Sequence, residues 1–207
     1  YTIGGVLRDG TESSSNPFNP GVINFGSGSG FADGALTSPI KLSTSWMYKY
    51  TSLNANYAGW QFVGVNGSIK IGEGFTMKGP SGSVPASEQQ NYVFSGKPNN
   101  GNISLTIGMN QTYLVGNPYP SALDADEFIK DNIKDGDGRA ASNIFNGALY
   151  FWDHFGGQTH ILNQYIGGYA TYTLMGGVVA MSNDPLTANN GTNGVKTPKR
   201  YIPVAQG

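Results

Sequence analysis

The chain has 207 residues and a formal net charge of −1, and only 12% of its residues are charged. This fraction is about half of the roughly 25% that is usual for soluble domains. The few Lys and Arg residues are scattered, which argues against a surface for nucleic acid or anionic membrane. Cysteine is absent, so neither disulfides nor thiolate metal sites contribute. No apolar run approaches the ~20 residues that a membrane-spanning helix needs.

The composition predicts a β-rich protein. Glycine occurs 31 times, and most of the remaining polarity comes from Asn, Ser and Thr. Gly and Asn suit tight turns, whereas Thr and the aromatic residues suit pleated strands. A chain of this length forms one large or two small domains and buries roughly 70% of its unfolded surface.

Residues 1–40 are rich in turn-forming residues, especially at 9–17 and 26–30. Phe18, Phe25 and Phe31 favour loops held against a core, with one or two strands, over a mobile linker. We therefore interpret residues 1–40 as a loop-rich lead-in to a β module.

Short aromatic or β-branched segments follow one another from residue 41, separated by turns that contain Gly, Asn or Pro. They cover residues 46–50, 59–63, 74–78, 90–94, 103–107 and 113–116. Ile103, Leu105 and Ile107 alternate with Ser104 and Thr106, and this period of two is typical of a half-buried strand. Repeated short strands predict a sandwich or a barrel.

One helix is predicted at residues 124–134. Asp124 is in position to be the N-cap, and Glu127 to reach back in a capping box. Ile129 and Ile133 fall on one face at helical spacing, so this face is expected to pack across one edge or end of the sheets.

The two halves of the module repeat an order of segments. An aromatic strand, a glycine-aromatic strand and a glycine-containing segment occur at 46–50, 59–62 and 71–75, and again at 149–152, 168–172 and 204–207. We predict one all-β fold over 41–207, sandwich or jelly-roll-like. Its related halves span about 45–118 and 147–207, with the helix in the connection between them.

This repeat also bears on Gly207. It aligns residues 204–207 with 71–74, where the chain continues into the predicted strand at 74–78. We therefore expect Gly207 to precede a further strand rather than to be a natural terminus. A missing strand would leave a sheet edge with unpaired backbone groups.

The sequence contains no catalytic constellation. The Gly-x-Ser-x-Gly pattern occurs only in the glycine-serine run at 26–30, away from any strand-to-helix turn. The acidic residues gather around the predicted helix, where capping explains them. We predict that the chain is not an enzyme and that it needs no cofactor.

Metal sites are possible at two places, and in both a metal-free reading is favoured. His154 and His160 with Asp153 lack an established ligand spacing and a third partner, so they are interpreted as surface or loop residues.

Asp131, Asp135 and Asp137 resemble part of a calcium loop. Arg139 stands where a further acidic ligand would be wanted, and no Glu follows. A turn after the helix is the favoured reading, with calcium as the weaker alternative.

Aromatic side chains suggest a sugar-stacking platform, since rings offer a large contact area with a polar handle. The candidates are Trp46, Trp60, Trp152, Tyr48, Tyr50, Tyr57, Tyr165 and Tyr169. Most of them are expected in the core. A carbohydrate-binding, lectin-like module is therefore the alternative function, with Trp152, Asp153, His154 and Tyr165 as candidate ligand-binding residues.

Several long motifs resemble a module found near the C-terminal ends of large Bacteroidota cell-surface proteins exported by the type IX secretion system. They lie at 72–79, 90–101, 116–124, 149–154, 167–172 and 200–207. The resemblance covers about residues 41–207.

The resemblance implies an extracellular or surface-attached protein, in which the module precedes a C-terminal sorting domain that the export machinery reads. The partners that the resemblance implies are neighbouring domains of the same protein and the type IX machinery. Glycans are a further candidate partner because of the aromatic residues, whereas the charge pattern and the lack of a long apolar run predict no nucleic acid and no membrane insertion. The implied role is a non-catalytic structural or adhesive one, and no site residue carries over from the resemblance.

Overall fold

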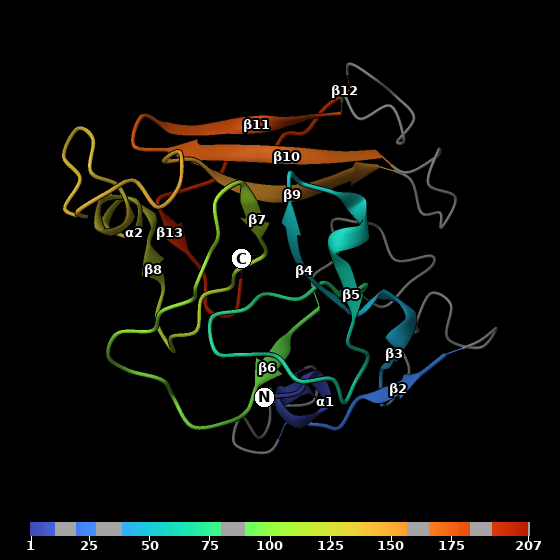
Figure 1. Ribbon diagram of the computed structural model, residues 1–207. Coiled ribbons are helices and arrows are strands. Elements are labelled where there is room, and N and C mark those ends of the chain that lie inside the picture. The colour runs from blue at the N-terminus through green and yellow to red at the C-terminus, as the bar shows by residue number, and fades with distance from the viewer. Residues whose placement is uncertain (11–19, 28–38, 80–89, 157–165, 183–191, 207) are drawn as a thin grey trace. The chain divides into compact units, whose positions relative to one another are not determined.

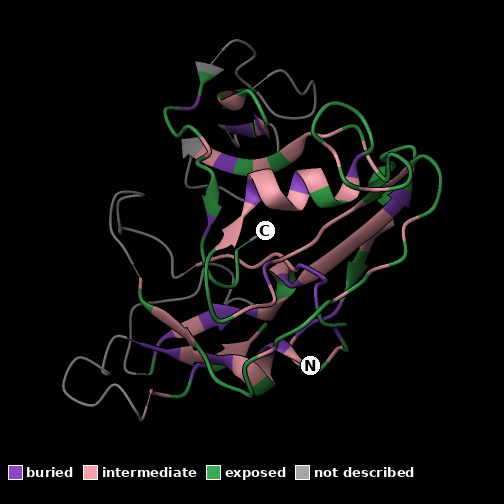
Figure 2. Cartoon of the chain, turned by 90° about the vertical axis from the view of Figure 1, so that its left-hand side faces the viewer, coloured by how far each residue is buried: buried purple, intermediate pink, exposed green. Residues whose placement is uncertain are grey.

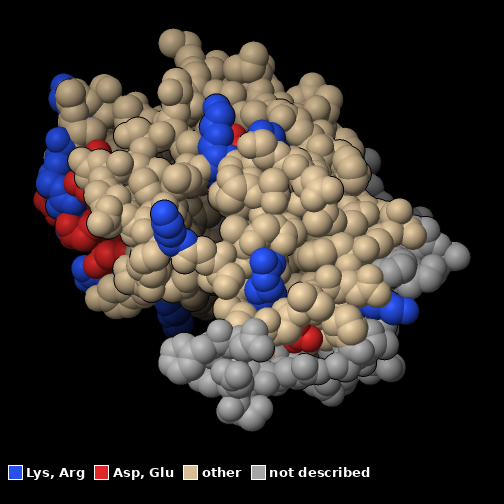
Figure 3. Space-filling model, turned by 90° about the horizontal axis from the view of Figure 1, so that it is seen from below, with Lys and Arg blue, Asp and Glu red and all other residues tan. Residues whose placement is uncertain are grey.

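The computed structural model describes residues 1–10, 20–27, 39–79, 90–156, 166–182 and 192–206. These residues form a mostly β protein with several small sheets (Figure 1). The chain divides into two compact units. The first comprises Tyr1–Pro120 with Ala205–Gly207, and the second comprises Ser121–Val204. On the face shown in Figure 3, charged side chains occupy a minor part of the surface.

The first unit is built from short elements. They are α1 (Ile3–Val6), β1 (Leu7–Asp9), β2 (Asn24–Gly26), β3 (Lys41–Ser43), β4 (Tyr48–Leu53), β5 (Trp60–Phe62), β6 (Tyr92–Phe94) and β7 (Gln111–Tyr113), with 3-10 turns at Thr44–Trp46 and Tyr57–Gly59. Strand β1 pairs with β6, and β5, β4 and β7 form an antiparallel sheet in that order. Strands β2 and β3 pair in parallel.

The core of the first unit includes residues from the N-terminal lead-in. Ile3 and Leu7 are fully buried and pack with Leu42, Met47 and Ile69. The start of the chain is therefore part of this core, and Phe25 of β2 packs against it as well.

Glu73 is a buried carboxylate that joins three parts of the first unit. Its Oε1 accepts a 2.6 Å hydrogen bond from the Tyr113 hydroxyl, and its Oε2 accepts a 2.7 Å bond from the backbone N–H of Lys70. Lys49 Nζ lies 3.5 Å from Oε2. Burial opposes ionisation, but the hydrogen bonds and the charge of Lys49 together hold the pKa of Glu73 below its usual value. The carboxylate thus links β4, β7 and the turn at 70–73.

The second unit contains the longer strands. Its elements are β8 (Leu123–Asp124), α2 (Ala125–Asn132), β9 (Leu149–Gly156), β10 (Ile166–Thr173), β11 (Gly176–Ser182), β12 (Thr192–Asn193) and β13 (Tyr201–Ile202). Strands β12, β11, β10 and β9 form an antiparallel sheet in that order, and β13 pairs with β8 (Figure 1).

Helix α2 confirms the predicted helix and its N-cap. The Asp124 side chain accepts from the backbone N–H groups of Asp126 and Glu127. Glu127 does not complete the predicted capping box, because its carboxylate lies 2.8 Å from Arg139 and 3.6 Å from Lys130. The helix ends at Asn132, two residues before the predicted end.

The apolar face of α2 packs against strands β10 and β13. Ala125, Ile129 and Ile133 form a core with Tyr172 of β10 and Ile202 of β13. In Figure 2, α2 and the strands carry buried residues interleaved with more exposed ones, as expected for elements with one face in a core.

Two predicted strands are wrong. Residues 103–107 form no strand, although Ile103, Leu105 and Ile107 are half-buried while Ser104 and Thr106 are exposed. Residues 74–78 also form no strand. Their backbone is nevertheless bonded on both sides, because Gly74 N donates to Leu114 O and Thr76 N to Tyr48 O.

We expect Ile129→Ala to lower the free energy of unfolding of the second unit by about 2–5 kcal/mol, because it leaves a cavity in a fully packed site. Ile129 has 0% of its surface exposed. Urea unfolding followed by circular dichroism measures the change. Ile144→Ala is the matched control, since Ile144 is 50% exposed. Equal effects of both substitutions would contradict the assigned core.

We expect Tyr113→Phe to destabilise the first unit by about 1.5–3 kcal/mol at pH 7, because a hydrogen bond to an ionised buried group is lost. The folded pKa of Glu73 is lowered. The stabilisation from its ionised form is therefore present above its unfolded pKa and is lost as pH falls through the folded pKa. Urea unfolding from pH 7 to pH 3 should show the difference between parent and variant narrowing. Tyr119→Phe, which loses only a bond to the Gly101 carbonyl, is the control. A constant difference would contradict the assignment.

Candidate functional site

The sheet of the second unit presents two rows of side chains on one face. The first row consists of register partners on adjacent strands: Trp152 of β9, Tyr169 of β10 and Met181 of β11. The second row consists of Tyr150, Thr171 and Val178. Residues directly opposite each other in an antiparallel pair project from the same face. We call the face formed by these residues the outer face.

The outer face is apolar and exposed. Trp152 is 43% exposed, Tyr169 and Met181 are each 54% exposed, and Tyr150 and Val178 are exposed as well. The inner face, by contrast, buries Ala170 and Tyr172 in the core beneath. An antiparallel sheet with one buried face usually carries polar side chains on the other. Here none of the residues in the two rows is charged. All of them except Thr171 have an aromatic or a purely apolar side chain.

Two glycines let the first row pack closely. The Trp152 and Tyr169 rings meet edge to face, with centroids 5.0 Å apart and planes at 72°. A Cβ added at Gly167 would lie 2.4 Å from Cζ2 of Trp152, and one added at Gly168 would lie 2.5 Å from the Met181 carbonyl oxygen. Any side chain at Gly167 would displace the indole ring, so the ring rests directly on the backbone of β10.

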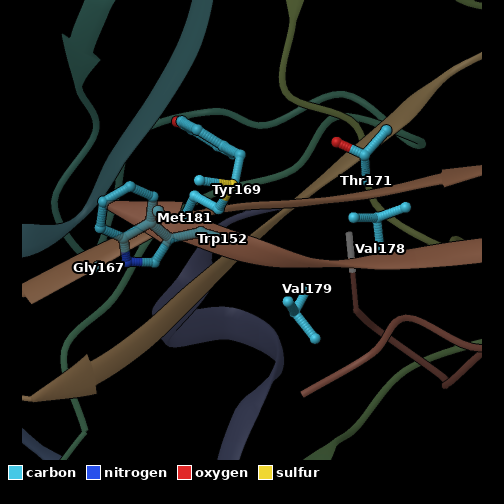
Figure 4. Close-up of a pocket in the computed structure, with 8 residues that line it drawn as sticks. Trp152, Gly167, Tyr169, Thr171, Val178, Val179 and Met181 are labelled. Atoms are coloured by element: carbon cyan, nitrogen blue, oxygen red, sulfur yellow. The ribbon is translucent and has the colours of Figure 1, made fainter. Parts of the chain in front are cut away.

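A shallow hollow of about 260 Å³ lies on this part of the sheet. Its lining includes Trp152, Tyr169, the Gly167–Gly168 backbone and Val178. In Figure 4, Trp152, Tyr169 and Met181 gather at one end of the sheet, and Thr171 and Val178 stand further along it. No carboxylate, histidine or lysine lines the hollow as far as the described residues define it.

The candidate residues from the sequence do not form one group. Trp152 is on the outer face. Asp153 follows it in the strand and therefore points to the opposite face, where it is only 6% exposed. Asp153 Oδ1 lies 3.9 Å from Lys196 Nζ, and its Oδ2 is buried without a hydrogen-bond partner. His154 is partly buried. Tyr165 and His160 lie outside the described residues.

The aromatic candidates of the first unit form separate pairs on β4 and β5. Tyr48 packs on Phe62 with ring centroids 5.4 Å apart, and Tyr50 packs on Trp60 at 4.7 Å. Trp46 has Lys78 Nζ 5.8 Å from its ring centroid, and Tyr57 is exposed. Of the eight candidate aromatics, Trp152 and Tyr169 are the pair that the structure joins on the outer face.

The outer face also contains four residues that are not among the candidates predicted from the sequence: Tyr150, Thr171, Val178 and Met181. A signal for Tyr150 is present, because Tyr150 and Trp152 are two apart in a strand and so share a face. The residues of β11 carry no comparable signal, since a register shift between Tyr169 and Thr171 decides which of them lie opposite β10.

The N-terminus of α2 is bonded to β10 on the side opposite the outer face. Arg200 donates from Nε and Nη2 to the Asp124 carboxylate at 2.8–3.1 Å. This pairing lowers the pKa of Asp124. The Tyr172 hydroxyl donates a 2.8 Å hydrogen bond to Asp126. Burial, with this bond, raises the pKa of Tyr172 to about 12.

Two of the three residues of the calcium alternative, Asp131 and Asp135, have protein partners. Asp131 accepts a 2.8 Å hydrogen bond from Arg139 Nε, and Asp135 accepts one from the Asn143 amide. Asp137 lies in the exposed turn that follows Gly136. Within the described ranges, no group of three His, Cys, Asp or Glu residues could hold a metal ion. The helices in these ranges include none that is long and apolar enough to cross a membrane.

Fold and face together define a mostly β domain with an exposed, uncharged aromatic surface on its larger sheet. The chain belongs to the family described as Domain of unknown function (DUF8693), whose model matches residues 29–207. No curated protein and no solved structure matches the chain.

We expect calcium and EDTA to leave the melting temperature unchanged. A ligand that binds only the folded state raises its stability, but Asp131 and Asp135 are already bound to Arg139 and Asn143. Differential scanning fluorimetry with 5 mM EDTA or with 5 mM calcium checks this. The calcium concentration is about 5- to 50-fold above the Kd of roughly 10⁻⁴–10⁻³ M that weak extracellular calcium sites have. A large loss in EDTA that added calcium reverses would establish the calcium alternative.

Proposed function

We propose that the chain is a non-catalytic, structural and adhesive module of an extracellular bacterial surface protein, and that the outer face is its contact surface. The observation that supports this role is the pair of exposed, uncharged rows on β9, β10 and β11. Contiguous exposed apolar patches mark interaction sites, and aromatic residues and Met are enriched at interfaces.

The surroundings of the titratable groups favour binding over catalysis. Glu73 is held by Tyr113 and Lys49, and Asp124 by Arg200. These contacts are structural, because each joins elements of the fold. The described lining of the hollow offers hydroxyl groups but no general base beside them.

The cellular context of the proposal comes from the motifs in residues 41–207. Their resemblance to modules of Bacteroidota surface proteins supports export by the type IX system and a location outside the cell or attached to its surface. The proposed partners are neighbouring domains of the same protein and, through a C-terminal sorting domain, the export machinery.

A shared turn supports the proposal that the module contains two related halves. Gly72 has φ +87° and Ala205 has φ +58°, and each follows a buried isoleucine, Ile69 or Ile202, by three residues. Ala205 is not glycine, and non-glycine residues seldom adopt positive φ, so a positive φ at both aligned positions supports the relation. A sandwich or jelly-roll-like arrangement of the halves is part of this proposal.

An adhesion assay tests the contact role. Beads that carry the purified chain are applied to surfaces coated with cellulose, xylan, collagen or the chain itself. We expect adhesion to at least one coating, and we expect Trp152→Ala/Tyr169→Ala to lose most of it, because both rings of the first row are removed. Tyr57→Ala is the control, since Tyr57 is 72% exposed in the first unit.

Circular dichroism and the melting temperature establish that each variant is folded. Adhesion of the folded double variant at the level of the parent, or no adhesion of the parent to any coating, would contradict the proposed contact face.

A further inference from the structure

We infer that the outer face binds an uncharged carbohydrate, with one sugar ring in the hollow beside Trp152 and Tyr169. This inference rests on the proposed contact role of the outer face and adds the chemical class of its ligand. Four properties of the face support it: ring geometry, charge, the size of the hollow and the number of residues.

The aromatic pair is held by contacts within the sheet. Trp152 is in contact with the Gly167 backbone on one side and meets Tyr169 edge to face, yet it keeps 43% of its surface open. The C–H face of a pyranose packs on such a ring as an apolar surface. Because the rings are already held, binding costs little side-chain entropy.

The lack of charge selects among polymers. Phosphate backbones and acidic polysaccharides are bound largely through Lys and Arg, and neither row contains these residues. The Thr171 hydroxyl can exchange hydrogen bonds with sugar hydroxyls. A neutral, hydroxyl-rich ligand with an apolar face therefore fits this surface better than a polyanion.

The size of the hollow fits one ring of a longer chain. Its volume of about 260 Å³ is just below the roughly 300–1,000 Å³ of pockets for drug-sized ligands. Tyr150 is two residues from Trp152, and this spacing places the second row about 6.7 Å along the strand. A sugar next to the bound ring would thus meet the second row, so an oligosaccharide should bind more tightly than a monosaccharide.

The number of residues favours a glycan over a folded protein partner. A stable protein interface uses roughly 20–30 residues on each side. The two rows supply far fewer, and these stand around one hollow on a single sheet. Sugar ligands engage a protein through a few stacked rings and hydrogen bonds, which is what this face contains.

Isothermal titration calorimetry tests the inference with defined probes. The neutral probes are cellohexaose, xylohexaose, laminarihexaose and mannohexaose, with glucose, xylose and mannose as their monomers. A heparin hexasaccharide is the acidic probe. We expect saturable binding of at least one neutral hexasaccharide, weaker binding of its monomer, and no binding of the heparin fragment.

Substitutions at the first row give the decisive comparison. Trp152→Ala and Tyr169→Ala should each raise the Kd by about tenfold or more. The Kd of Trp152→Phe should lie between the Kd of Trp152→Ala and that of the parent. Tyr57→Ala should bind as the parent does. Parent-like affinity of a folded Trp152→Ala variant, or binding of the heparin fragment alone, would overturn the inference.

The two proposals fail in different ways. If adhesion depends on Trp152 and Tyr169 but no neutral hexasaccharide binds or competes, the carbohydrate inference is overturned while the contact role stands. A protein such as the collagen coating or a second copy of the chain would then be the partner. If neither adhesion nor sugar binding depends on these residues, both proposals are overturned.

Discussion

The candidate site depends on the cluster at the N-terminus of α2. Asp124 belongs to β8, caps the helix and accepts a forked pair of hydrogen bonds from Arg200, which precedes β13. Asp126 in the first turn accepts from Tyr172 of β10. An exposed ion pair alone contributes little to stability. This cluster matters because it places the helix against the inner face of β10. The side chain of Tyr172 points toward the core. Because side chains alternate between the two faces of a strand, Tyr169 and Thr171 point to the opposite, outer face.

Local signals in the sequence predicted the parts of the fold that local interactions determine. The N-cap at Asp124 and the apolar face of α2 follow from spacing within a few residues, and both are present. The strand predicted at 103–107 has the expected alternation of burial, yet no ladder forms there. Alternation reports which side chains are covered, but pairing needs a partner strand that is distant in sequence. The role of Glu73 could not be predicted from the sequence for the same reason, since its partners Tyr113 and Lys49 come from separate strands.

The site shows the same division more sharply. The sequence predicts Trp152 as a site residue together with its neighbours Asp153 and His154, but adjacent residues in a strand point to opposite faces of the sheet. The true neighbours of Trp152 are Tyr169, across the ladder, and Gly167, under its ring. Met181 entered the row through a register shift between β10 and β11 that no spacing rule predicts. The sequence therefore indicated the type of residue at the site, whereas the ladder determined its members.

The glycines at 167 and 168 connect composition with the proposed role. Glycine inside a strand weakens it, because it adds no packing and loses more entropy on folding. The pair is nevertheless required here, since a Cβ at either position would collide with Trp152 or with the backbone of β11. A strand that carries this cost in order to seat an exposed indole holds that ring in one orientation. The low content of charged residues has a related consequence, because a surface solvated by hydroxyl, amide and aromatic groups attracts polyanions weakly. A fixed ring on an uncharged face suits a neutral polymer with apolar ring faces. A charged face would favour charged ligands instead, and a flexible face would select its ligands less strictly by shape.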